Sequence, residues 1–388
     1  MAAQTILHAK ENRRRDRFRT ASGIDPVFLM LLLLLLALGL AMLYSASFAQ
    51  SEYDSGYTDS ARYLRKQAIC AGIGLVCMAA FSRLPAALWQ RLAWPVYGGS
   101  IVLLLLVLAA GQEVNGAKRW ISVAGIQFQP SEIAKFSVIL LFSALGAQYG
   151  RQAKQFRFGV LGFGCALLGI LIPLALEKHL SAIMLMGMVA VVMMYLAGTS
   201  PRWIAAGIGC AGAFVLVYIS CMGYAGDRVT AWIHPEADPG DTGYQILQSL
   251  YAIGSGGLFG LGLGKSRQKY LYLPFQYNDY IFAVVCEELG LMGALGIMAL
   301  FAALILRGYR LALGAADRFS MLLAAGLVTL IAVQTLLNLA VVTNLLPSTG
   351  IALPFFSYGG TALAVNLGEM GIVLGISRQR NREKIQEA

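Results

Sequence analysis

Charged residues are scarce in this chain of 388 residues, because Asp, Glu, Lys and Arg together make up only 13% of it. Apolar residues account for 58%, and apolar stretches repeatedly approach the roughly 20 residues that cross a bilayer as a helix. The composition therefore predicts a polytopic membrane protein.

Alternating apolar and polar segments of the kind found in outer-membrane barrels are absent. Lipid offers the backbone no hydrogen-bond partner, so the spans are expected to be helical and the fold class all-α. The apolar stretches predict ten transmembrane helices, near 26–48, 66–82, 94–110, 131–149, 159–176, 180–198, 203–223, 279–304, 320–343 and 361–377.

Cysteine pairs and histidine clusters are also missing. The six cysteines lie in or beside apolar runs without a CxxC pair, and the three histidines are scattered. The cysteines are interpreted as small buried apolar residues, and no metal site is recognisable.

The net charge of +10 is distributed in a way that indicates membrane topology, not nucleic-acid binding. If both termini are cytoplasmic, the inner segments carry 19 Lys and Arg residues and the outer loops carry 10. This bias predicts a membrane protein with both termini cytoplasmic: a basic N-terminal tail (1–25), a ten-helix domain (26–377) and a C-terminal tail (378–388).

Three outer segments are too long and too polar to be simple connectors: Gln112–Pro130, Ala225–Asn278 and Leu345–Gly360. The second belongs to a large extracytoplasmic loop, 224–278, between the seventh and eighth spans. Because long loops commonly carry function, and all three lie on one side, we expect the chemistry to face the outside.

Three carboxylates lie in "PFQYNDYIFAVVCEELG": Asp279 at the lip of an apolar run, and Glu287 and Glu288 inside it. Helical geometry places Glu287 about 12 Å below Asp279 and Glu288 on the opposite side, so the three cannot form one site. Glu287 and Glu288 are interpreted as interhelical contacts. Asp279, which water and a headgroup can reach, is the candidate catalytic residue.

Glu132 and Lys135 open the fourth span in "QPSEIAKFSVI". A separation of three residues lets them pair on one helical face. The pair either shapes a functional cavity or is purely structural, and the sequence leaves both possibilities open.

A glycine-rich run, "GSGGLFGLGLGKSRQK", looks like a phosphate-binding P-loop, but Phe259 occupies a position where that motif needs glycine. Its amides, with Lys265, Arg267 and Lys269, could instead cradle a diphosphate. The alternative is a flexible loop that rests on anionic lipid headgroups. The preceding "GYQILQSLYAIG" is expected to lie in the membrane interface.

Four segments occur in the order found in one known family: "VNGAKRWI…QPSEIAK", "GYQILQSLYAIGSGGLFGLGLGKSRQKYLYLP", "NDYIFAVVCEELGLMG" and "LLPSTGIALPFFSYGGTA". Together they resemble the SEDS family, the FtsW, RodA and SpoVE proteins, over nearly the whole chain. The resemblance implies a ten-span peptidoglycan glycosyltransferase that polymerises lipid II, closest to the division-type FtsW/SpoVE branch.

The resemblance also implies residue roles. Asp279 matches the family's essential acid, and Glu132 and Lys135 match a pair in its central cavity. Lys118, Arg119 and Ser357, which lie in the shared segments, join Lys265, Arg267 and Lys269 as candidate diphosphate ligands. Two departures concern local shape: Lys178 stands where the family commonly has proline, and Asn344 stands where glycine is frequent.

Inverting transfer from an α-diphosphate needs one base, so Asp279 is expected to deprotonate the acceptor hydroxyl while Mg²⁺ or Mn²⁺ assists the leaving diphosphate. The expected partners are lipid II, membrane lipid, a class B penicillin-binding protein and other divisome components. A lipid II flippase, an elongation-type RodA-like polymerase and a non-catalytic scaffold for a transpeptidase are the alternatives. No inverted repeat supports the flippase.

Overall fold

The computed structural model describes residues 23–114, 117–123, 126–221, 232–237 and 242–386, and within these the chain is predominantly helical. The helices that coincide with the predicted spans are α2 (Pro26–Asp54), α3 (Arg62–Phe81), α4 (Ala86–Ala110), α5 (Pro130–Tyr149), α6 (Phe163–Leu176), α7 (Leu180–Leu196), α8 (Pro201–Cys221), α11 (Ile281–Leu313), α12 (Arg318–Val342) and α13 (Thr361–Gln386).

Each predicted span therefore falls on a helix, with boundaries that differ by a few residues at most ends. Among the residues that the structure describes, seven helical segments are long and apolar enough to cross a membrane, and α7 is a shorter apolar helix. A π-helical turn, η2 (Arg157–Gly162), leads into α6. The chain is an integral membrane protein, and the count of ten spans stays a prediction.

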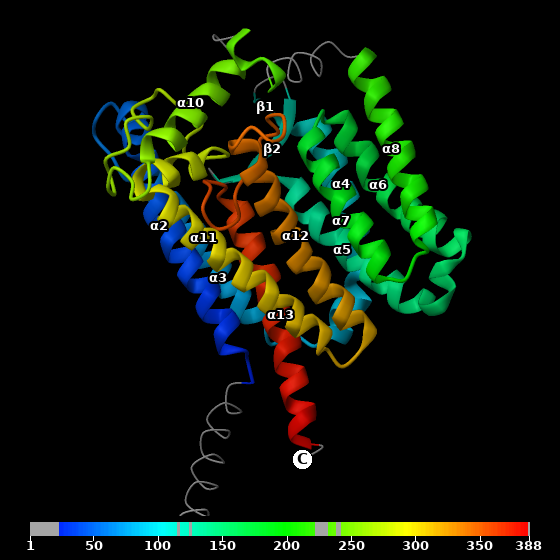
Figure 1. The fold of residues 1–388 in the computed structure, drawn as a ribbon. Helices are drawn as coiled ribbons and strands as arrows, with labels where there is room; N and C mark the ends of the chain where they lie inside the picture. Colours follow the sequence, from blue (N-terminus) through cyan, green and yellow to red (C-terminus); the bar gives the residue numbers. More distant parts are fainter. Residues whose placement is uncertain (1–22, 115–116, 124–125, 222–231, 238–241, 387–388) are drawn as a thin grey trace, which may run out of the picture.

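The first turn of α2 and the end of α13 lie at the same end of the helix bundle (Figure 1). The opposite end carries α10 (Thr242–Gly256) and a small sheet. We call these the terminal end and the loop end. Two short 3₁₀ helices, η1 (Gly150–Lys154) and η3 (Pro235–Ala237), complete the described elements.

The small sheet corrects the expectation of an all-α fold. Strands β1 (Gln112–Val114), β2 (Ala117–Val123) and β3 (Ile126–Phe128) form an antiparallel meander in the first long loop. Val114 pairs with Ala117, and the sequence between them reads Asn-Gly, a strong short-range hairpin signal.

Helices α5 and α12 form the centre of the bundle. About two thirds of the most apolar window of α5 and 83% of that of α12 are buried, compared with 28% for α3, α4 and α11. The peripheral helices keep apolar side chains on their exposed faces, as expected where the surrounding solvent is lipid. Core and surface are therefore both apolar.

Helix α11 is interrupted at Gly290, whose φ of 65° and ψ of −171° are not helical. The glycine-rich loop that follows α10 docks at this break. Leu261 and Gly262 donate to the carbonyls of Glu287 and Glu288 at 2.9 and 3.0 Å. Leu291 and Met292 donate in turn to the carbonyls of Gly257 and Leu258 at 2.9 and 3.1 Å. The loop thus takes over hydrogen bonds that the helix loses.

Replacing Gly290 by alanine is predicted to destabilise the protein. A Cβ atom there would overlap the amide nitrogen of Gly260, and the backbone conformation alone costs a side-chain-bearing residue about 1–3 kcal/mol. Thermal unfolding of the purified variant in detergent should show a clearly lowered midpoint. Gly296→Ala is the control, since the same helix leaves space for its Cβ. Equal midpoints for the two variants would contradict this account of the break.

Candidate active site

Asp279 lies two residues before α11, and its backbone is fixed by a buried side chain of α12. Asn338 donates from Nδ2 to the carbonyl oxygen of Asp279 at 2.7 Å and to that of Ile351 at 2.8 Å. Asn338 is fully buried, whereas Asp279 is partly exposed. One amide therefore joins the Asp279 segment to the loop Leu345–Gly360.

Gly350 brings that loop against the Asp279 carboxylate. A Cβ atom built on Gly350 would lie 3.6 Å from Oδ2 of Asp279, and the glycine has a φ of +65°. This left-handed conformation is open to glycine without steric cost. The loop can therefore approach the carboxylate with its backbone.

The same loop is anchored on two more sides. Tyr358 donates its amide to the carbonyl of Tyr277 at 2.8 Å. Gln67 of α3, fully buried, accepts from the amides of Gly359 and Gly360 and donates to the carbonyl of Ser357. Asp279 therefore lies in a frame built from segments before α11, after α12 and at the start of α3.

Glu132 and Lys135 form the predicted pair at the start of α5, with 2.7 Å between Oε2 and Nζ. Both side chains are buried, which strengthens their mutual attraction relative to water. A third ionisable group, Glu369 of α13, is 3% exposed, and the charges of Lys135 and Glu132 act on it. Within the described residues, neither carboxyl oxygen of Glu369 has a hydrogen-bond partner.

Arg119 of β2 holds the turn between α6 and α7. Its guanidinium donates to the carbonyl of Lys178 at 2.5 Å and to that of Glu177 at 3.5 Å. His179 follows, and its Nε2 atom lies 3.5 Å from the side-chain Nε2 atom of Gln129. Ser181, at the start of α7, donates to the carbonyl of Thr349. The turn therefore contacts the loop that carries Gly350.

Burial controls the protonation of this turn. It raises the pKa of Glu177 to about 8, although the Arg119 guanidinium opposes the shift. Burial, with help from the charges of Arg119 and Lys135, lowers the pKa of His179 to about 3. Both side chains are therefore neutral at pH 7, and the nearby cations are the dominant charges.

Two departures from the family pattern have a backbone explanation. Lys178 has a φ of 55°, which proline cannot adopt, so the turn differs in shape from one with proline at this position. Asn344 has a φ of 58°, a conformation that asparagine tolerates better than other residues with a side chain. Its carbonyl also accepts from the indole of Trp232 at 3.0 Å.

Glu287 and Glu288 hold the glycine-rich loop, which modifies their expected role as interhelical contacts. Glu287 accepts from the amide of Arg267 at 2.9 Å and from the hydroxyl of Ser266. Glu288 accepts from Ser45 of α2 at 2.6 and 2.7 Å. Only this last contact joins two helices. The main task of the two carboxylates is to fix the loop against α11.

Lys269 needs a correction as a candidate diphosphate ligand. It is 2% exposed, and its ammonium pairs with Glu288 at 3.1 Å and donates to the carbonyl of Gly264 at 2.6 Å. A buried carboxylate requires such a partner, so Lys269 stabilises the loop instead of facing a ligand. Lys265 and Arg267 of the same loop are exposed.

The other three candidate diphosphate ligands, Lys118, Arg119 and Ser357, differ in exposure and in hydrogen-bond partners. Lys118 is exposed on β2, and Arg119 is directed at the carbonyls of the α6–α7 turn. Ser357 is buried and accepts from the amide of Leu353 at 2.8 Å, so its hydroxyl supports the loop backbone. Sequence reasoning missed Asn338, Gln67 and Glu369. Glu369 had a visible signal as a carboxylate in an apolar span, whereas the two amides had none.

Comparison with known proteins decides the family. A family model for FtsW, RodA and SpoVE, described as "Cell cycle protein", matches residues 26–382. The chain belongs to this FtsW/RodA/SpoVE family. The match extends from the first turn of α2 almost to the end of α13.

FtsW/RodA/SpoVE relatives share much of this sequence. The chain is 39% identical over 360 residues to "Probable peptidoglycan glycosyltransferase FtsW" of Geobacter metallireducens, covering 91% of this chain and 94% of the relative. It is 37% identical over 360 residues to "Stage V sporulation protein E" of Bacillus subtilis, covering 91% and 97%.

Solved structures of FtsW/RodA/SpoVE proteins have the same fold. One, described as "Structural coordination of polymerization and crosslinking by a peptidoglycan synthase complex", aligns with a TM-score of 0.78 at 28% identity, covering 92% of this chain and 98% of that chain. Rod shape determining protein RodA of Thermus thermophilus aligns with a TM-score of 0.68 at 27% identity, covering 92% and 97%.

Glu177 predicts a pH-dependent stability. The folded state keeps this carboxyl protonated up to about pH 8, while the unfolded state ionises it near 4.5, so the unfolded state binds fewer protons between these values. Stability is therefore lost as the pH rises through that window. Glu177→Gln removes this loss. Thermal midpoints of variant and wild type should diverge with rising pH and level off above the window.

Glu236→Gln, the same substitution at an exposed carboxylate outside this turn, supplies the control. A difference between Glu177→Gln and wild type that stays constant across the window would show that Glu177 is not held neutral.

Proposed function

We propose that this chain is a peptidoglycan glycosyltransferase that polymerises lipid II, with Asp279 as its general base. The proposal rests chiefly on one observation: a partly exposed carboxylate is held by its backbone in a buried frame made by three separate segments. Catalysis benefits from such a fixed but accessible group. Membership of the family and the names of the relatives support the reaction class.

The reaction transfers a sugar from a lipid-linked α-diphosphate to a hydroxyl and inverts the anomeric centre. A single displacement with one base achieves this, without a covalent intermediate. In our proposal Asp279 accepts the proton from the 4-hydroxyl of the acceptor GlcNAc as the oxygen attacks the anomeric carbon of the donor MurNAc. Undecaprenyl diphosphate then leaves.

Lys135 is proposed to support the departure of the diphosphate from the cavity side. Its ammonium is buried and paired with Glu132, and its charge reaches His179 in the turn beside the Leu345–Gly360 loop. A cation in a water-poor site stabilises developing negative charge more strongly than one in water. Glu132 keeps that ammonium in place.

In the cell we propose ten membrane spans, cytoplasmic termini and a loop end that faces the outside. The first turn of α2 and the end of α13 lie at the same end of the bundle, which supports this topology together with the bias of basic residues (Figure 1). A class B penicillin-binding protein is the proposed partner, since an aligned structure is a peptidoglycan synthase complex that couples polymerization and crosslinking. The FtsW names favour cell division and contact with other divisome components.

Asp279→Asn is predicted to abolish polymerisation while the protein still folds. The substitution keeps size and hydrogen-bonding capacity but removes the base, and losing a general base lowers rates by about 10²–10⁴. Purified protein in detergent or proteoliposomes should be monodisperse, with a wild-type thermal midpoint, yet form almost no glycan from labelled lipid II.

Glu236→Gln provides the matched control, since it neutralises an exposed carboxylate of η3, outside the segments that form the frame around Asp279. Near wild-type polymerisation by folded Asp279→Asn would sink the base assignment. If the wild type makes no glycan and Asp279→Asn still moves lipid II across the vesicle membrane, the result would instead favour the flippase.

A divalent cation, Mg²⁺ or Mn²⁺, is proposed to assist. The described residues contain no group of three or more His, Cys, Asp or Glu side chains that could cage a metal ion. Mg²⁺ commonly binds through substrate phosphates and waters, so the diphosphate itself would supply the ligands. The cation would offset the charge of the leaving diphosphate, together with the basic side chains near it.

Chelator is therefore predicted to remove most of the polymerisation rate, and added Mg²⁺ or Mn²⁺ to restore it. The thermal midpoint should stay unchanged by the chelator, because the described part of the protein supplies no cage that the ion would stabilise. Full activity in excess chelator would assign the charge compensation to basic side chains alone.

A further inference from the structure

Polar side chains meet at the terminal end of α2, α11 and α13. Arg307 of α11 pairs with Asp25, the residue that caps α2, with 2.5 Å between Nη2 and Oδ2. Ser377 of α13 accepts from the amide of Asp25 at 3.2 Å. Arg307 remains about a third exposed. These contacts form a polar layer across three helices.

A second polar layer lies nearer the loop end. Ser45 of α2, Glu288 of α11 and Lys269 of the glycine-rich loop contact one another, with Ser45 Oγ 3.3 Å from Lys269 Nζ. Here again helices α2 and α11 are joined, now with the loop as the third member.

The two layers are separated by the thickness of a bilayer. Between Asp25 and Ser45, and between Glu288 and Arg307, neither helix carries a charged residue. These intervals of 20 and 19 residues correspond to about 28–30 Å at 1.5 Å per residue, which matches a hydrocarbon core of about 30 Å. Helices α2 and α11 thus agree on where each of the two edges of the hydrocarbon core lies.

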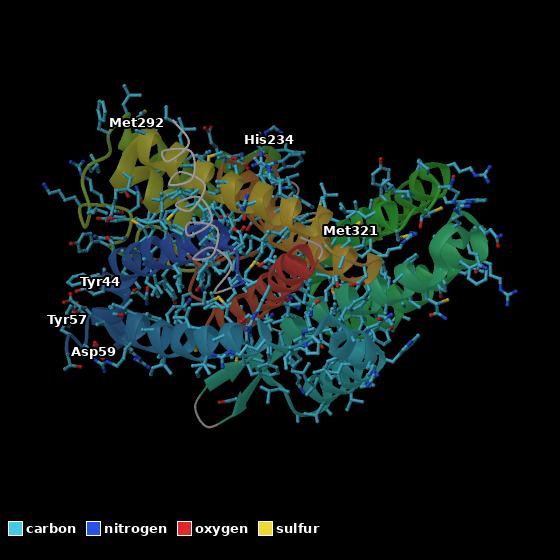
Figure 2. All side chains as sticks on the ribbon, turned by 90° about the horizontal axis from the view of Figure 1, so that it is seen from below. Tyr44, Tyr57, Asp59, His234, Met292 and Met321 are labelled. Atoms are coloured by element: carbon cyan, nitrogen blue, oxygen red, sulfur yellow. The ribbon has the colours of Figure 1, made fainter. Side chains whose placement is uncertain are left out.

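Side-chain exposure agrees with this position. All eight residues of α11 from Ile281 to Glu288 are buried, whereas Leu291, Met292 and Leu295 are about half exposed. Met292 of α11 and Tyr44 of α2 both lie at the periphery of the molecule (Figure 2). The surface of α11 therefore changes at Gly290 from enclosed by protein to open to lipid.

The glycine-rich loop lies at this edge. Its bonds to the α11 backbone place Gly257 to Gly262 level with residues 287–292. Three large apolar side chains of the loop are exposed, Leu258 by 60%, Phe259 by 81% and Leu263 by 67%. The exposed cations Lys265 and Arg267 follow immediately.

We propose that residues 257–267 form a membrane-surface anchor: Leu258, Phe259 and Leu263 enter the hydrocarbon of the leaflet at the loop end, and Lys265 and Arg267 contact the phosphates of its phospholipids. The apolar side chains continue the lipid-facing surface of α11, because Met292 bonds to the carbonyl of Leu258. Basic residues next to apolar ones fit the boundary between acyl chains and anionic headgroups.

Insertion of the loop's apolar side chains into lipid does not expose the loop's other polar groups, because these are buried in the protein. Glu288 and Lys269 are buried and form an ion pair, and the buried Glu287 accepts from Ser266 and the amide of Arg267. The backbone bonds to α11 satisfy the amides of Leu261 and Gly262. Irregular backbone at membrane depth is tolerated only where protein satisfies it in this way. The loop is therefore built to present apolar side chains, not unpaired polar groups, to lipid.

The anchor also sets the height of Asp279. Nine residues separate it from Glu288, which places it about 13 Å beyond the hydrocarbon edge if the helical rise is applied throughout. Headgroups occupy roughly 5–8 Å on each side of a bilayer. Asp279 then lies just beyond the headgroup layer.

Spin-label accessibility tests the anchor without using activity, so its failure is distinguishable from failure of the proposed function. A nitroxide is attached at Phe259→Cys, and separately at Leu263→Cys, in a variant whose native cysteines are replaced, reconstituted in phospholipid nanodiscs. Collision rates with oxygen, which concentrates in hydrocarbon, and with a water-soluble nickel chelate are compared.

Two control sites calibrate the scale. Met292→Cys reports the lipid-facing side of α11, and Tyr57→Cys, at a residue 78% exposed in the turn after α2, reports the aqueous side (Figure 2). Labels at 259 and 263 are expected to resemble the label at 292, with collisions favouring oxygen. Lys265→Ala combined with Arg267→Ala should shift the label at 259 toward the chelate.

Labels at both 259 and 263 that match the label at 57 would overturn the proposal. So would immobilisation of the label at 259 by added undecaprenyl diphosphate while the label at 292 is unaffected, because the occupant would then be a polyprenyl chain instead of phospholipid. Circular dichroism and a monodisperse elution profile confirm that each labelled variant is folded.

Discussion

The half of the molecule at the loop end depends on the repair of a broken helix. At Gly290 helix α11 loses its regular hydrogen bonds, and lipid could not replace them. The glycine-rich loop replaces them with backbone bonds at 2.9–3.1 Å. Glu287 and Glu288 then bind the rest of the loop, so that helix and loop behave as one unit. Close approach of the two backbones explains why Gly256, Gly260 and Gly290 leave no space for a Cβ atom.

This unit determines the surroundings of the candidate active site. The loop bonds to α11 between Glu287 and Met292. The first two turns of α11, which come just before this stretch, are buried, and Asp279 immediately precedes them. Asn338 can then fix the Asp279 carbonyl from α12, and Gly350 can reach the carboxylate from the opposite direction. The glycine-rich loop and the candidate base Asp279 are thereby connected through the first two turns of α11.

Sequence alone could predict the helices, because apolar segments of bilayer length have few alternatives. The Glu132–Lys135 pair followed from spacing, and α11 was expected from its apolar run. The break at Gly290 was not predicted, since a glycine within an apolar run is compatible with an unbroken helix. Nor could spacing show that Lys269 pairs with Glu288, 19 residues away, or that Asn338 reaches both Asp279 and Ile351. Such contacts depend on how the helices pack.

The proposed position of the bilayer restricts how a lipid-linked donor could use this site. Lys265 and Arg267 belong to the loop that is level with Glu287 and Glu288, at the hydrocarbon edge, whereas Asp279 lies about 13 Å beyond that edge. The anomeric carbon of the donor is bonded directly to its diphosphate, so at the moment of transfer both must be near Asp279. The diphosphate would then lie above the phospholipid phosphates and closer to Lys135, Arg119 and the Leu345–Gly360 loop. This difference in height separates the cations: Lys265 and Arg267 at the edge suit the phosphates of the bilayer, and Lys135 inside the protein suits the reacting diphosphate.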